Sequence, residues 1–188
     1  MRRTFIAIPV PPADDRLLTF LVRCRSAFPS SRIRWVDPSI LHLTLAFIGE
    51  TTEADIPRVK IMMQQLASRH SPFMFTITGT GFFGNAGKPS VLWAGISSGS
   101  ELALLQSDIV KELQSIGIRQ DSKPFSPHLT IGRIKDYKPG PLPDKFMNSY
   151  SSVELQETDV REIIYYESVL TPGGPVYKAI GRFQLVGH

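Results

Sequence analysis

The sequence predicts an α+β protein in which mostly antiparallel strands are flanked by helices. Short segments rich in β-branched and aromatic residues recur along its 188 residues, separated by longer segments with apolar residues at helical spacing. Apolar residues make up 42% of the chain and charged residues 20%, which is enough for a sizeable core. We expect residues 1–188 to form a single domain, one that could contain two similar lobes.

The first part of the chain alternates strand and helix signals. Thr4–Val10 is a short apolar run, and the prolines at 11–12 can then open an amphipathic helix. Thr52 can cap a second helix, and Gly117 stands where the C-terminal glycine of a third helix is expected. Glycines spread over 79–87 predict a loop. In order, the expected elements are strand 4–10, helix 11–28, strand 32–36, a turn at 37–38, strand 41–48 closed by Gly49, helix 53–68, strands 73–80 and 91–96, and helix 100–117.

The last third is richer in strands. The run His128–Ile134 alternates polar and apolar residues, as a half-buried strand does. Prolines over 139–143 predict an irregular connection, and Pro-Gly-Gly-Pro at 172–175 predicts a turn between two strands. The remaining expected strands are 152–156, 160–170 and 176–186. This order of elements favours antiparallel pairing.

Two of the four histidines stand in the same three-residue setting, His-Leu-Thr, at 42–44 and 128–130. Because side chains alternate across a strand, the histidine and threonine of each copy share one face while the intervening leucine faces a core. The residue four positions after each histidine is small, Ala46 in one copy and Gly132 in the other. We expect both small residues to lie on the polar face and to leave space there.

A pair of imidazoles with a pair of hydroxyls suits phosphodiester hydrolysis. Thr44 and Thr130 each supply a short, stiff hydroxyl that can hydrogen-bond a phosphate oxygen. His42 and His128 can each donate or accept a proton near neutral pH. Across a cleft, one imidazole can take a proton from water while the other gives a proton to the departing oxygen. The residues themselves do not say which histidine is the acid.

Other kinds of site have less support in the sequence. His-x-Thr is not the spacing of a helical pair of zinc ligands, and neither copy contains a cysteine cluster or a carboxylate. We therefore predict neither a metal nor a cofactor, and we expect His70 and His188 to be solvated. A noncatalytic module that binds RNA ends stays an alternative, although such a module would not need two titrating groups.

Charge and cysteine content indicate the partners and the compartment. The net charge of +4 permits an anionic partner such as RNA or a phosphate ester. Cys24 is the single cysteine and lies at an apolar position of the first helix, so we interpret it as a packing residue in a reducing compartment. No apolar run approaches the roughly 18 residues of a membrane span. We expect a cytoplasmic monomer without a membrane partner.

The two His-Leu-Thr copies give the chain a resemblance to the 2H phosphoesterases, whose signature is the doubled His-x-Thr motif. It is most similar to their RNA 2′,3′-cyclic phosphodiesterase branch, also called 2′-5′ RNA ligase, and the similarity covers nearly the whole chain. It rests on Arg-Thr-Phe-Ile-Ala-Ile-Pro at 3–9, Trp35, His-Leu-Thr-Leu-Ala-Phe-Ile-Gly-Glu at 42–50, Pro-Phe-Ser-Pro-His-Leu-Thr-Ile-Gly-Arg at 124–133, Tyr-Glu-Ser-Val-Leu at 166–170 and Tyr177.

The resemblance implies a bilobal 2H phosphoesterase fold, with two pseudo-symmetric lobes around a central cleft. It implies metal-independent hydrolysis of an RNA-terminal 2′,3′-cyclic phosphate to a 2′-phosphate, with 2′-5′ ligation as a related reverse activity. In that assignment His42 is the general acid, His128 is the general base, and Thr44 and Thr130 bind the nonbridging oxygens. A phosphodiesterase for small cyclic nucleotide phosphates stays an alternative with the same chemistry.

Residues around the motifs are weaker candidates for substrate binding. The resemblance also places an arginine at Arg133, but in an ideal strand this side chain would point away from His128. It reaches the cleft only if the strand ends or bends, for example at Gly132. Other candidates are Phe125, Trp35 and Tyr137 for stacking on a base, and Arg32, Arg34, Lys88, Lys123 and Lys135 for steering an RNA backbone.

Overall fold

A computed structural model of the chain describes residues 1–85, 87–120 and 124–187. Its strands join into a single nine-stranded sheet, in which β7-β4-β5-β6-β3-β1-β8-β9 is the order of neighbours and β2 lies beside β6. Every neighbouring pair is antiparallel. The strands are β1 (Arg2–Pro9), β2 (Arg32–Trp35), β3 (His42–Thr51), β4 (Phe73–Asn85), β5 (Lys88–Ser98), β6 (His128–Asp136), β7 (Glu154–Val160), β8 (Glu162–Thr171) and β9 (Gly174–Gln184).

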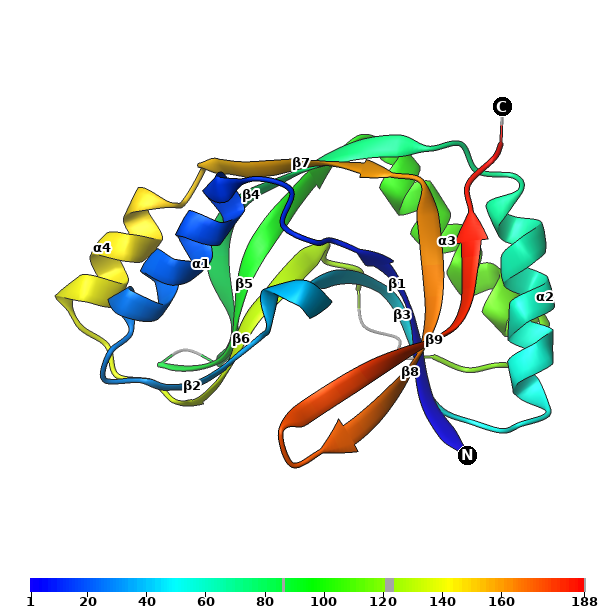
Figure 1. Cartoon of the computed structure of the whole chain (residues 1–188), viewed down its shortest axis with the longest axis horizontal. Coiled ribbons are helices and arrows are strands. Elements are labelled where there is room, and N and C mark those ends of the chain that lie inside the picture. Colours follow the sequence, from blue (N-terminus) through cyan, green and yellow to red (C-terminus); the bar gives the residue numbers. More distant parts are fainter. Residues whose placement is uncertain (86, 121–123, 188) are drawn as a thin grey trace.

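Helices gather at the two ends of this curled sheet (Figure 1). One group contains α1 (Asp15–Ala27) and α4 (Pro141–Ser149), and the other contains α2 (Asp55–Ala67) and α3 (Ser100–Ser115). A short 3-10 helix, η1 (Pro38–Ile40), leads into β3. The predicted α+β fold with antiparallel pairing is confirmed. The sheet is continuous between the two ends, which places β3 and β6 in its middle.

The core forms because each long helix buries one apolar stripe against the sheet. In α3 the buried residues are Leu102, Leu105, Ile109 and Leu113, spaced at three or four positions. In α1 the stripe includes Cys24, which is fully buried, and burial raises the pKa of its thiol to about 12. The interpretation of Cys24 as a packing residue therefore fits its surroundings. None of the helices in the described residues is long and apolar enough to cross a membrane.

The proline-rich connection expected at 139–143 is wrong, because α4 begins there. Pro141 and Pro143 occupy its first turn, where a missing backbone N–H breaks no helical hydrogen bond. Phe146 then packs on Phe20 of α1 with ring centroids 5.5 Å apart. Prolines near a helix start and prolines in a loop look alike in sequence, and the aromatic contact that favours the helix is made to a distant segment.

Three element boundaries also differ from the expected ones. The helix expected from residue 11 begins at Asp15, because the side chain of Asp14 caps it by accepting a hydrogen bond from the backbone N–H of Arg16 at 2.9 Å. The second helix begins at Asp55, where the hydroxyl of Thr52 accepts a hydrogen bond from the Asp55 N–H at 3.2 Å. Gly49 does not end β3 but sits inside it with φ +79°. The glycine of a β-bulge commonly has such a positive φ.

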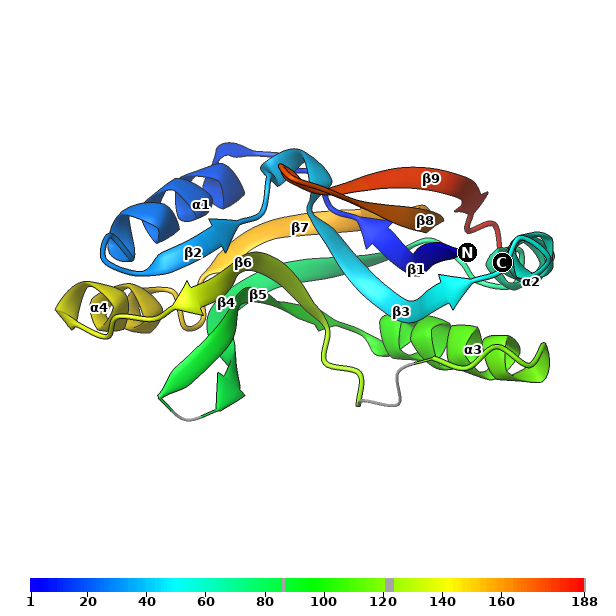
Figure 2. The same ribbon diagram turned by 90° about the horizontal axis from the view of Figure 1, so that it is seen from below.

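The glycine-rich segment predicted as a loop belongs to the long β4–β5 hairpin, which projects from the sheet (Figure 2). At Gly81 the ring of Trp93 from β5 lies so close that an added Cβ would clash with its Cζ2 atom. A glycine is needed there because the strand accommodates an indole across its backbone. Glycine composition alone does not separate this packing role from a turn.

We expect Gly81→Ala to destabilise the protein by about 1–3 kcal/mol, the usual cost of forcing an extra group into a packed region. The matched control is Gly173→Ala, where a Cβ would meet only the Thr171 hydroxyl, at 3.7 Å. Urea unfolding of both variants measures the difference. Equal stability of the two variants would show that Trp93 moves aside without cost.

Candidate active site

The centre of the sheet contains one bridge between β3 and β6, and it joins Leu43 to Leu129. These are the leucines of the two His-Leu-Thr copies. They are 1% and 0% exposed, so both face the core. Their neighbours along each strand must therefore lie on the opposite face of the sheet. The neighbours are His42, Thr44, His128 and Thr130, hereafter the histidine–threonine cluster.

The register of this bridge sets each histidine against the threonine of the other copy. Counting outward from an antiparallel pair, His42 stands opposite Thr130. By the same count, Thr44 stands opposite His128. Residues directly opposite on one face have Cβ atoms about 4.5–5.5 Å apart. The fold thus brings both sequence motifs into one group, related by a local two-fold axis through the leucine pair.

The two histidines make the same local hydrogen bond. Nδ1 of His42 lies 2.8 Å from the carbonyl oxygen of Ile40, and Nδ1 of His128 lies 2.7 Å from that of Ser126. A carbonyl oxygen can only accept, so Nδ1 carries the hydrogen in each ring. Nε2 is consequently the nitrogen of each ring that can exchange a proton with a ligand.

Aromatic side chains from other strands hold the imidazoles in place. The ring of His42 lies against Phe5 of β1 at 5.1 Å and edge-on to Tyr177 of β9 at 5.0 Å. The ring of His128 lies edge-on to Phe83 of β4 at 4.7 Å. Sequence reasoning assigned no site role to these three aromatic residues. Phe5 and Tyr177 stand in segments that carried the family resemblance, whereas Phe83 fell in the supposed loop.

The pKa of His42 lies below its ordinary value. Burial is the largest cause, because a covered site penalises the charged imidazolium. The hydrogen bond to the Ile40 carbonyl opposes burial by favouring the protonated ring. The positive charge of Arg133, and that of His128 when its ring is protonated, lower this pKa further. The two charges act on His42 because both residues lie close to it.

A β-bulge explains how Arg133 comes to the cluster face. In β6, Thr130 pairs with Trp93 and Gly132 pairs with Leu92, so Ile131 is an extra residue. Since β5 has no extra residue in this stretch, Trp93 and Val91 lie on the same face. Arg133 is the partner of Val91 and therefore shares the face of Thr130. The strand is therefore not ideal at this point, and the irregularity next to Gly132 brings Arg133 to the cluster face, the condition that the sequence set for it.

The matching bulge in β3 overturns the expected position of Ala46. Thr44 pairs with Ala7 and Ala46 with Ile6, which makes Leu45 the extra residue. Ala46 is consequently buried at 6% exposure, and Phe47 is 50% exposed on the cluster face. The small residue leaves no space beside the polar pair.

Gly132 has the same role in β6 as Ala46 in β3. A Cβ at Gly132 would lie 2.6 Å from Cγ2 of Ile33 and 3.2 Å from the Trp35 ring. The glycine therefore makes room for β2 on the core side of the sheet. The prediction that Gly132 leaves space beside the polar pair is wrong for that reason.

Several other sequence candidates take part in packing. Trp35 lies 6.4 Å from Phe28, and Tyr137 lies 5.5 Å from Phe82, so both belong to the core around α1 and α4. Phe125 is half-buried against the core, and its proposed contact with substrate stays a prediction. Lys123 and His188 lie outside the described residues.

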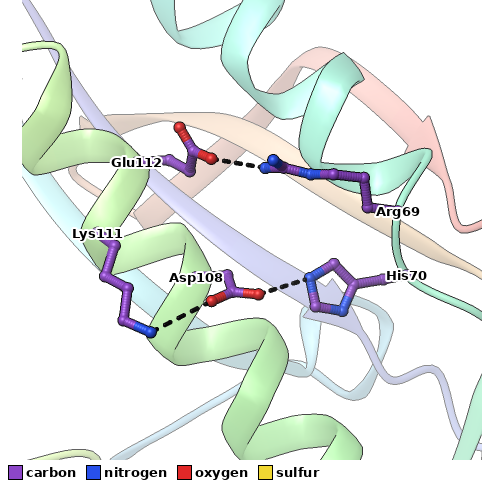
Figure 3. Close-up of a pocket in the computed structure, with 5 residues that line it drawn as sticks. All are labelled: Arg69, His70, Asp108, Lys111 and Glu112. Carbon is purple, nitrogen blue, oxygen red and sulfur yellow. Dashed lines mark hydrogen bonds and ion pairs between the residues drawn. The ribbon is translucent and has the colours of Figure 1, made fainter.

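His70 belongs to a separate polar pocket between α2 and α3 (Figure 3). Its Nε2 lies 3.2 Å from an Asp108 oxygen, and its side chain is only 16% exposed, so the expectation that it is solvated is wrong. Arg69 pairs with Glu112 across the same pocket at 2.6 Å. No residue of the histidine–threonine cluster lines it. Over the described ranges, no group of three His, Cys, Asp or Glu side chains is arranged to hold a metal ion.

Comparison with known proteins shows the family to which the sequence is related. The model of the 2′-5′ RNA ligase superfamily matches residues 12–164. An Archaeoglobus fulgidus protein named RNA 2′,3′-cyclic phosphodiesterase is 35% identical over 97% of this chain and 99% of its own length. An Aquifex aeolicus protein of the same name is 36% identical, over 82% of each chain.

Solved structures show the same fold. A Thermus thermophilus protein is similar with a TM-score of 0.80 and 29% identity, over 98% of each chain. The structure of E. coli LigT complexed with 3′-AMP has a TM-score of 0.78 and 24% identity, again over 98% of each chain. At that identity the second likeness concerns the fold alone.

We expect the pKa of His42 to be below about 6.5, the ordinary histidine value. Arg133→Gln should raise it, because a positive charge that disfavours the imidazolium is removed. It should stay below the ordinary value, since burial is the larger cause. NMR titration of the imidazole Cε1–H resonances measures both values. An unchanged or lower pKa in the variant would mean that Arg133 does not act on His42.

Proposed function

Because the chain belongs to the 2′-5′ RNA ligase superfamily, we propose that it is an RNA 2′,3′-cyclic phosphodiesterase. It opens a terminal ribose 2′,3′-cyclic phosphate to a 2′-phosphomonoester. The observation that carries this proposal is the Leu43–Leu129 bridge, which gathers two imidazoles and two hydroxyls on one face of the sheet. A phosphate bound there would have an imidazole available on each side.

The proposed reaction is an in-line displacement at phosphorus. The Nε2 of one histidine takes a proton from water, and the water oxygen forms a bond to phosphorus. The bond from phosphorus to the 3′ oxygen breaks, and the Nε2–H of the other histidine protonates that oxygen. The products are a 2′-phosphate and a free 3′-hydroxyl, with one proton moved from the acid to the base. The reaction is proposed to need no metal ion.

We assign His42 as the acid and His128 as the base. Membership of the family suggests this assignment, and the surroundings of His42 support it. Its lowered pKa makes the imidazolium a stronger proton donor to the departing 3′ oxygen. Each threonine stands opposite the histidine of the other strand, where its hydroxyl can donate to a nonbridging oxygen.

The same geometry supports the two related activities. In the reverse sense, the 5′-hydroxyl of a second strand would take the place of water and give a 2′-5′ linkage. A small cyclic nucleotide phosphate would place the same phosphodiester at the cluster. We take an RNA end as the substrate because the curated relatives named above carry that substrate in their names.

We further propose that residues 1–188 work as one domain and as a monomer in the cytoplasm. The continuous sheet joins the two groups of helices, and β3 and β6 supply the whole cluster from one chain. The one cysteine is buried, which suits a reducing compartment. Sedimentation of the purified protein tests the oligomeric state.

We expect His42→Ala and His128→Ala each to lower kcat by about 10²–10⁴, because each removes one proton-transfer group. The assay follows an oligonucleotide with a 2′,3′-cyclic end and separates 2′- from 3′-phosphate products. His70→Ala is the matched control, since His70 pairs with Asp108 away from the cluster. Full activity of either cluster variant, or a 3′-phosphate product, would contradict the proposal.

Activity should also persist in EDTA. Loss of activity in EDTA that added zinc restores would reject metal independence.

We expect Thr44→Val to lower kcat/KM by about tenfold or more, because a hydrogen bond to a charged oxygen is lost with little change of volume. Thr44→Ser keeps a hydroxyl and should retain most of the activity. Steady-state kinetics on the same substrate compares the two. Equal activity of valine and serine at this position would mean that the hydroxyl does not contact the phosphate.

A further inference from the structure

Two arginines stand opposite each other beside the histidine–threonine cluster. In the β2–β6 pair, Arg34 is the partner of Arg133, while Trp35 is the partner of Gly132. Partners in an antiparallel pair share a face. Trp35 packs towards the core next to Gly132, so Arg34 and Arg133 lie on the other side. That side is the face of Thr130, as the pairing of β5 with β6 shows.

This arrangement is unfavourable without an anion. Like charges directly opposite in neighbouring strands repel each other. Arg34 and Arg133 are both exposed, and in the described part of the chain neither forms an ion pair with a carboxylate. Arg2 and Arg182, on other strands, do pair with glutamates. The two facing guanidiniums thus form a positive position without a negative partner among these residues.

The position is next to the reacting centre and yet distinct from it. Arg133 follows Thr130 by three residues, but the bulge makes this stretch match two residues of β5, about 7 Å along a strand at roughly 3.3 Å per residue. Its charge lowers the pKa of His42, and it also lowers the pKa of Tyr177, which burial raises. Arg34 lies about 4.8 Å from Arg133 across the sheet, on the edge of β6 opposite β5, which is the edge that β3 also pairs with. The pair therefore continues the cluster towards β2.

The pair at the other end of β2 brings a negative charge into the same two strands. Arg32 stands opposite Asp136, whose carboxylate lies 3.2 Å from Nζ of Lys138. A negative charge is thus already present at that end. Among the described residues, Arg34 and Arg133 are thus the facing pair of this strand pair that carries two positive charges, and one phosphate group can accept from both. Two planar guanidiniums can each donate a pair of N–H groups to phosphate oxygens.

We propose that Arg34 and Arg133 together bind the phosphate on the 5′ oxygen of the terminal nucleoside, that is, the last internal phosphodiester of an RNA strand. This inference rests on the proposed function, which places the cyclic phosphate at the histidine–threonine cluster. One nucleoside then spans the two sites. Arg34 is a specificity-determining residue in this arrangement, because it distinguishes an RNA end from a mononucleotide that has no 5′ phosphate.

The test compares three substrates with the full chain and with Arg34→Gln. They are a trinucleotide with a 2′,3′-cyclic end, a 2′,3′-cyclic mononucleotide with a 5′-hydroxyl, and the same mononucleotide with a 5′-phosphate. For the trinucleotide we expect kcat/KM to fall about 10- to 100-fold, the range for lost hydrogen bonds to a charged group. For the mononucleotide with a 5′-hydroxyl we expect less than a twofold change. Lys60→Gln, at an exposed position of α2, controls for the loss of one positive charge.

Salt dependence gives an independent readout. For the trinucleotide, log kcat/KM falls as log salt concentration rises, and Arg34→Gln should make this slope shallower by about 0.7. The variant makes one fewer charged contact to the phosphate of a single strand, so salt has one fewer contact to weaken. Arg34→Lys should restore that slope but only part of kcat/KM, since the charge returns without the planar fork. A lysine variant equal to the glutamine variant in slope would contradict a charge contact.

The outcomes distinguish failure of the proposed function from failure of the phosphate site. If the unaltered protein hydrolyses none of the substrates, the proposed function fails. If the unaltered protein is active, the phosphate site is overturned by either of two results. One is that Arg34→Gln lowers kcat/KM equally for the trinucleotide and the 5′-hydroxyl mononucleotide; the other is that it lowers kcat/KM for neither. If only the mononucleotide with a 5′-phosphate is affected, the site takes a terminal monoester, and the proposed diester is overturned. Arg34→Gln should unfold at the same temperature as the unaltered protein or slightly above it, because the side chain is exposed and its loss relieves the repulsion from Arg133.

Discussion

The burial of Leu43 against Leu129 is the constraint on which the rest of the site depends. A buried leucine stabilises the fold by about 1.5–3 kcal/mol, and here two are fixed by one bridge between the central strands. Because side chains alternate, this burial commits the residues on either side to the opposite face. A slip of one residue in either strand would move an imidazole into the core and a leucine into water. The hydrophobic core therefore sets the positions of polar groups that contribute nothing to it.

The two halves of the site share their irregularities as well as their motifs. Each strand places a buried bulge at the third and fourth positions after its histidine, Leu45–Ala46 in β3 and Ile131–Gly132 in β6. The fifth position returns to the cluster face in both strands, and there the halves differ, with Phe47 in one and Arg133 in the other. Burial and the positive charge of Arg133 both lower the pKa of His42.

The residues that sequence reasoning located are those whose role follows from local pattern. The doubled His-Leu-Thr motif, the helical stripes and the Pro-Gly-Gly-Pro turn each depend on neighbours within a few positions. The bulges could not be predicted, because an extra residue is defined only by the partner strand. The same holds for Gly81, whose neighbour Trp93 is close only after β4 and β5 pair, and for Phe83, which reaches His128 from another strand. What depended on long-range pairing was missed even where the residue types were informative.

The lowered pKa of His42 has a consequence for the order of events in the site. An unfolded histidine, with a pKa of about 6.5, binds a proton more tightly than the folded His42, so folding opposes protonation of this imidazole. Stability from this residue is present above that pH and is lost as pH falls through the folded pKa. A bound phosphodiester brings a negative charge next to Arg133 and His128, the two charges that lower the pKa of His42. Each unit by which the substrate raises the pKa of His42 corresponds to about 1.4 kcal/mol of favourable coupling between substrate binding and protonation of this ring. The substrate itself would then help to protonate the acid, which suits a group whose proton is needed only when a phosphate is present.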